Sequence, residues 1–220
     1  MVNSIILNSS LTVGITLQNW TADNHGIFLD GLIKKGFTLI PPNPVQQMQG
    51  EPAPIAHKTK TTAIWIDHFT RRIDLQITNE NTKPNENIKE ILDVLAIIGF
   101  PSQESVERMD IQGNVTIKLQ DAKSSELVPQ IIEKRFKTKT NEIFERDVKV
   151  IGIRLSSTEP LTSGVSKSPF VILIEPLFTD DSDTKMIVNV SYSSSSADST
   201  LEFAQCLYER LKQIISGLKD

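Results

Sequence analysis

The chain has only one cysteine, Cys206, among its 220 residues. A single thiol cannot form an intramolecular disulfide or a cysteine-based metal site, and it favours a reducing, cytoplasmic setting. No apolar run approaches the ~18 residues of a membrane span. The N-terminus lacks the positive flank and the long apolar run of a signal peptide. We therefore expect a cytoplasmic protein that does not associate with membranes.

The common catalytic and cofactor motifs are also missing. Neither GxGxxG nor GxxxxGK occurs, which disfavours nucleotide binding through a glycine-rich loop, and no GxSxG elbow is present. No HExxH, CxxC or paired-histidine spacing predicts a metal site. Asp67-His68 has two interpretations, an acid/base pair or a solvated hairpin turn. We predict no catalytic residues, no metal and no cofactor, and the sequence favours a non-enzymatic protein.

The basic residues are scattered along the chain and are not concentrated in one segment. Lysine and arginine number 23 against 27 acidic residues, which gives a net charge of −4. A mildly acidic protein with scattered basic residues is an unusual dedicated nucleic-acid binder. The length is sufficient for one large domain or two small ones.

The clearest helical pattern covers residues 87–101 (NIKEILDVLAIIGFP). Asn87 and Glu90 can cap its start, and Gly99 and Pro101 can end it. Its apolar residues recur with the spacing of one helical face: Ile88, Ile91, Leu92, Leu95 and Ile98.

The same order of elements precedes and follows this helix. Before it we expect strands at 11–17, 37–40, 61–66 and 72–78, a short helix at 25–36 in which His25 caps the start, and a proline-rich loop at 41–57. After it we expect strands at 111–119, 148–155, 170–177 and 185–191, and helices at 125–136 and 199–216, the last with a Ser199–Glu202 capping box.

This order predicts an α+β protein made of two pseudo-repeats, residues 1–100 and 101–220, within one domain. The strands alternate in polarity, so one face of their sheet must be covered. We expect one curved antiparallel sheet with the long helices on one face and the other face open.

Two segments resemble the TATA-box-binding-protein family. Residues 97–117 (IIGFPSQESVERMDIQGNVTI) are similar to its inter-repeat segment, and residues 61–66 (TTAIWI) to a strand before its first long helix. The resemblance implies a two-repeat saddle whose concave sheet lies on the DNA minor groove and wedges phenylalanines between base steps.

The wedge positions do not carry the residues that this function needs. Ile66 and Glu175 stand where the family has strand-end phenylalanines, and Asp74 stands at an apolar contact. A carboxylate that faces phosphates is repulsive, and Glu175 cannot act as an apolar wedge. The resemblance therefore predicts the fold, whereas DNA recognition is disfavoured by Asp74 and Glu175.

Three functions remain as hypotheses. The first is an interaction protein whose open sheet face binds a protein partner or a second copy. The second is a DNA-associated regulator of the saddle type, and the third is a small-molecule pocket with residues 41–57 as a lid. The predicted partner-binding residues are Ile64, Ile66, Arg72, Asp74, Gln76, Glu175, Lys185, Ile187 and Asn189. In the same interpretation Trp65 packs under a helix.

Overall fold

The computed structural model describes residues 3–41, 53–59, 61–78, 84–97, 106–127, 152–156, 170–177, 179 and 181–217. The elements, in chain order, are β1 (Ser4–Leu17), α1 (Ala22–Lys34), β2 (Thr38–Leu39), β3 (Ala56–Lys58), β4 (Thr62–Asp67), β5 (Arg72–Thr78), α3 (Pro84–Ile97), β6 (Val106–Leu119), β7 (Ile153–Ser156), β8 (Val171–Pro176), β9 (Lys185–Ser194) and α6 (Ala197–Gly217).

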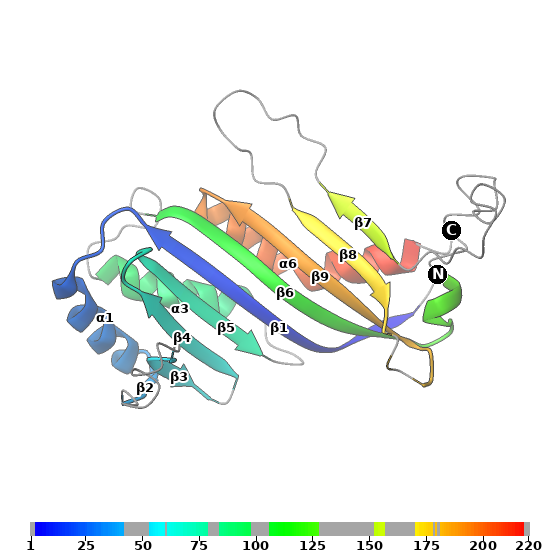
Figure 1. Cartoon of the computed structure of the whole chain (residues 1–220), viewed down its shortest axis with the longest axis horizontal. Helices are drawn as coiled ribbons and strands as arrows, with labels where there is room; N and C mark the ends of the chain where they lie inside the picture. The colour runs from blue at the N-terminus through cyan, green and yellow to red at the C-terminus, as the bar shows by residue number, and fades with distance from the viewer. Residues whose placement is uncertain are drawn as a thin grey trace, which may run out of the picture.

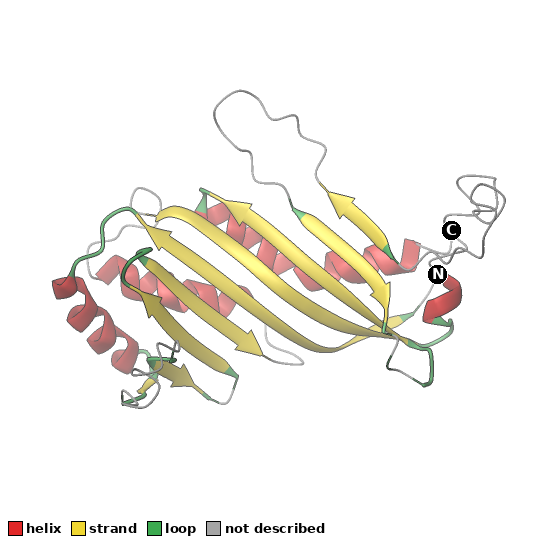
Figure 2. Cartoon of the chain, viewed as in Figure 1, coloured by secondary structure: helices red, strands yellow, loops and turns green. Residues whose placement is uncertain are grey.

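All nine of these strands form one antiparallel sheet in the order β2-β3-β4-β5-β1-β6-β9-β8-β7. The two longest strands, β1 and β6, lie side by side at its centre, with β5 and β9 outside them (Figure 1). Helices α3 and α6 cover one face, behind the sheet in Figure 2, and α6 contacts β1, β6 and β9. The predicted α+β class with one large antiparallel sheet is confirmed.

Alternation along each strand decides which side chains reach the helices. In β5, Ile73, Leu75 and Ile77 are buried, while the residues between them are half-buried on the other face. The register carries the same division into β1, where Val13 pairs with Leu75 and Ile15 pairs with Ile73. The core therefore lies between the sheet and the helices, because the apolar period of two matches the pleat.

The helix starts differ from the predicted ones. Helix α3 begins at Pro84 and not at Asn87, since the fixed φ of proline suits a first helical position. Helix α6 begins at Ala197, because the Ser196 hydroxyl accepts the Ser199 N–H and caps the helix upstream of the predicted box. Thr21, and not His25, caps α1.

Helix α1 packs closely against α3 at Gly31. A Cβ on Gly31 would lie 2.6 Å from Cγ1 of Val94, so only glycine permits this approach. The predicted C-cap of α1 is confirmed, since Gly36 adopts a φ of 85° just beyond its end.

Several predicted segments fall wholly or partly outside the described residues. These are residues 42–52 of the proline-rich loop, the Gly99–Pro101 end of the long helix, residues 128–136 of the helix predicted at 125–136, and residues 148–151 of the following strand. The described helices include none that is both long and apolar enough to cross a membrane.

Candidate functional site

The sheet face opposite the helices carries two neighbouring rows of small and amide side chains. Strand pairing brings Gln76, Thr12, Gln112 and Ser191 into one row. It brings Ser10, Asn114 and Asn189 into the next row. We call these seven residues the polar band. The band crosses β5, β1, β6 and β9 at the centre of the uncovered face, which Figure 1 shows toward the viewer.

The side chains of the polar band make no hydrogen bond within the part of the chain that the structure describes. Amide groups donate and accept, and hydroxyl groups do both through one oxygen. Asn114 and Asn189 lie directly opposite each other on β6 and β9. The band therefore offers neutral donors and acceptors to whatever covers this face.

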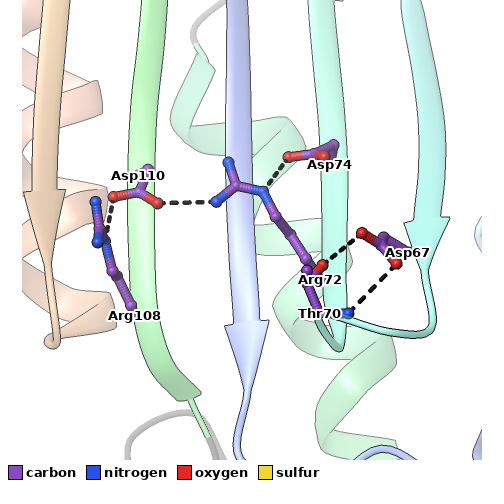
Figure 3. Close-up of polar contacts among 6 residues, drawn as sticks. All are labelled: Asp67, Thr70, Arg72, Asp74, Arg108 and Asp110. Atoms are coloured by element: carbon purple, nitrogen blue, oxygen red, sulfur yellow. Dashed lines mark hydrogen bonds and ion pairs between the residues drawn. The ribbon is translucent and has the colours of Figure 1, made fainter.

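A network of four charged residues lies at one end of the polar band (Figure 3). Nε of Arg72 donates to Oδ1 of Asp74 at 2.7 Å, and its Nη1 donates to Oδ2 of Asp110 at 3.0 Å. Nε of Arg108 donates to the other oxygen of Asp110 at 2.7 Å. We call these four residues the charge network. Two of the four residues lie on β5 and two on β6, and the charges alternate in sign along the network, so they neutralise one another.

Asp110 is the most buried member of the charge network, with 3% of its surface exposed. Burial raises the pKa of its carboxyl, but hydrogen bonds from Ser193, Arg108 and Arg72 outweigh this, and the pKa lies below its usual value. Asp110 therefore stays ionised and holds β5, β6 and β9 together from the open face. Arg72 reaches it by crossing β1 at Gly14, which pairs with both Asp74 and Asp110.

Seven of the nine predicted partner-binding residues lie on the open face, in two groups. Arg72, Asp74 and Gln76 are on β5, and Glu175, Lys185, Ile187 and Asn189 are on β8 and β9. Strands β1 and β6 separate the two groups.

The predicted faces of the β4 side chains are wrong. Ile64 is fully buried and pairs with Leu75, and Ile66 pairs with Ile73 and packs against the core. Trp65 pairs with Asp74 and lies on the open face instead of under a helix. Residues 61–66 are apolar at both parities apart from threonine, so their pattern does not reveal the buried face.

The centre of the site lies on β1 and β6, where the sequence predicts no binding residue. A usable signal existed on β6, where Arg108, Asp110, Gln112 and Asn114 alternate with apolar residues or glycine. On β1 the signal was Gly14, which lies between two threonines on the same face of the strand.

A shallow groove lies at the end of the sheet distant from the charge network. It has a volume of about 560 Å³. Its lining combines apolar residues with two neutral polar residues and one lysine: Ile5, Ile6, Leu7, Asn8, Thr116, Leu177 and Lys185. The lid predicted for a small-molecule pocket falls mainly on residues 42–52, outside the described chain.

Asp67 stabilises the β4–β5 turn. Its Oδ1 accepts the backbone N–H groups of Phe69 and Thr70, and its Oδ2 accepts the Thr70 hydroxyl. These bonds lower the pKa of Asp67, with the Thr70 hydroxyl as the largest cause. This geometry agrees with the hairpin-turn interpretation of Asp67-His68.

No family model, curated protein or solved structure matches the chain.

Proposed function

We propose that this chain is a non-enzymatic interaction protein whose open sheet face binds a protein partner or a second copy of itself. The observation that carries the proposal is the polar band, whose seven side chains have no hydrogen-bond partner among the described residues. A protein surface with complementary donors and acceptors would satisfy these groups without removing an unpaired charge from water.

The charges of the open face support a protein partner over DNA. On this face the described residues include five cations, Arg72, Arg108, Lys118, Arg154 and Lys185. They also include four anions, Asp67, Asp74, Asp110 and Glu175. The face is close to neutral, whereas DNA affinity comes mainly from an excess of lysine and arginine against phosphates.

DNA association of the saddle type is the second candidate, and the strand order favours it. We infer that the two halves are pseudo-repeats, since the last strand of each half lies beside its first, β5 beside β1 and β9 beside β6. A long helix follows that last strand in each half, α3 after β5 and α6 after β9.

Sedimentation velocity and DNA titration separate these candidates. If the face binds a second copy, wild-type protein sediments as a dimer, and Gln112→Arg shifts it to a monomer. Gln205→Arg introduces the same change at an exposed position of α6 and leaves the dimer intact. If the face binds another protein, the wild type is a monomer that does not bind duplex DNA at low salt. Salt-dependent binding to the duplex would favour the second candidate.

A further inference from the structure

Two of the three histidines meet where α1 contacts the β4–β5 turn. His25 lies in the first part of α1, and His68 lies in the turn between Asp67 and Phe69. Their ring centroids are 4.9 Å apart and the ring planes are inclined at 59°. The rings are therefore neighbours without being stacked face to face.

This spacing suits two imidazoles that bind one metal ion. An imidazole nitrogen binds Zn²⁺ at about 2.1 Å, and the ring centre lies roughly 1 Å further along the same line. Two ring centres at about 3.2 Å from the ion, separated by a tetrahedral angle, are about 5 Å apart. The observed separation agrees with this value.

One ring nitrogen of His25 also suits a metal ligand. Its Nδ1 is buried and has no hydrogen-bond partner among the described residues. An imidazole nitrogen that has no hydrogen-bond partner can offer its lone pair to a metal.

The surrounding charges have opposing effects on a cation. Asp23 in the first turn of α1 and Asp67 beside His68 contribute negative charge. The positive end of the α1 dipole opposes a cation at this place. Arg71 has other partners, since its guanidinium donates to the Gln18 carbonyl and forms an ion pair with Glu107.

We propose that His25 and His68 form a two-histidine site for a divalent transition metal that prefers imidazole, such as Zn²⁺, with water completing the coordination. Within the described ranges no group of three or more histidine, cysteine or acidic side chains gathers around one point. With two protein ligands, the site binds more weakly than a closed structural zinc site. Binding would join the start of α1 to the β4–β5 turn, at whose tip Phe69 is fully exposed.

Isothermal titration of the full chain with ZnCl₂ at pH 7.5 tests the site. We expect one equivalent to bind with a micromolar Kd, and at least tenfold weaker binding for His25→Ala and His68→Ala. His57→Ala removes the third histidine, which lies exposed on β3, and leaves binding unchanged. Cys206→Ser removes the free thiol and also leaves it unchanged.

A second measurement guards against variants that fail to fold. His68→Asn keeps a polar side chain in the turn, and its circular dichroism without metal should match that of the wild type. Zn²⁺ should raise the thermal midpoint of the wild type, reversibly with EDTA, and should not raise that of His68→Asn. Absence of binding to the wild type, or equal binding by the wild type and both alanine variants, would overturn the proposal.

Discussion

The guanidinium of Arg72 lies directly over Gly14. A Cβ on residue 14 would be 1.9 Å from Nη2 of Arg72 and 2.2 Å from Cζ, too close for any side chain. The missing side chain leaves the space through which Arg72 reaches from β5 across β1 to Asp110 on β6. The charge network of the open face therefore depends on Gly14, although β1 itself carries no charged residue.

Gly14→Ala should break the charge network and destabilise the protein. The methyl group displaces the Arg72 guanidinium from Asp110, and the loss of this charge-assisted hydrogen bond costs about 1.5–3 kcal/mol. Urea unfolding measures this cost. Gly26→Ala is the matched control, because a Cβ there meets nothing within 4 Å, and replacing glycine by alanine in a helix is neutral or stabilising by up to about 1 kcal/mol. Equal stability of Gly14→Ala and the wild type would contradict the observed path of Arg72.

Asp110→Asn should lower the free energy of unfolding in a manner that depends on pH. The substitution removes the anion that accepts hydrogen bonds from two guanidinium groups, at a cost of about 1.5–3 kcal/mol at pH 7. The folded-state pKa of Asp110 is depressed, so its contribution is present above the unfolded pKa of about 3.9 and is lost as the pH falls through the folded pKa. The difference in stability between the two proteins should therefore begin to shrink near pH 4 and disappear once the pH is below the folded pKa. A difference that stays constant down to pH 2 would exclude a role for the ionised carboxylate.

Tyr208→Phe tests a contact that joins α6 to β1 on the covered face. The hydroxyl groups of Tyr208 and Ser9 are 2.6 Å apart. Removing the phenolic oxygen should cost about 1 kcal/mol. Tyr192→Phe is the control, since the Tyr192 ring stacks on Phe203 and its hydroxyl has no hydrogen-bond partner among the described residues. We expect Tyr192→Phe to unfold like the wild type, and a Tyr208→Phe variant that did the same would show that the Ser9 contact is dispensable.

The elements whose apolar residues recur at regular spacing are predicted well from the sequence. The bounds of β5 are as predicted, because Ile73, Leu75 and Ile77 alternate with polar residues. Helix α3 was recognised from its apolar stripe, but its start was misplaced because Pro84 initiates the helix before the asparagine that resembles a cap. Element type follows from local pattern, whereas the ends depend on which of several capping groups the fold uses.

The contacts between distant segments could not be predicted in this way. The strand order brings Arg72 to Asp110. The packing of α1 against the β4–β5 turn brings His25 to His68. The open side of β4 was misassigned because both of its faces are apolar, and only the pairing with β5 resolves them. A single sequence shows which residues of a strand share a face, but it does not show which strand lies beside it.

The central claim is that the open sheet face binds protein, and site-specific photocrosslinking in living cells tests it most directly. Benzoylphenylalanine replaces Gln112 in the polar band or, as the matched control, Gln205 on α6. Our account predicts a discrete protein adduct from position 112, which disappears when Asn189→Arg is added, and none from position 205. No adduct from position 112, or the same adducts from both positions, would contradict it.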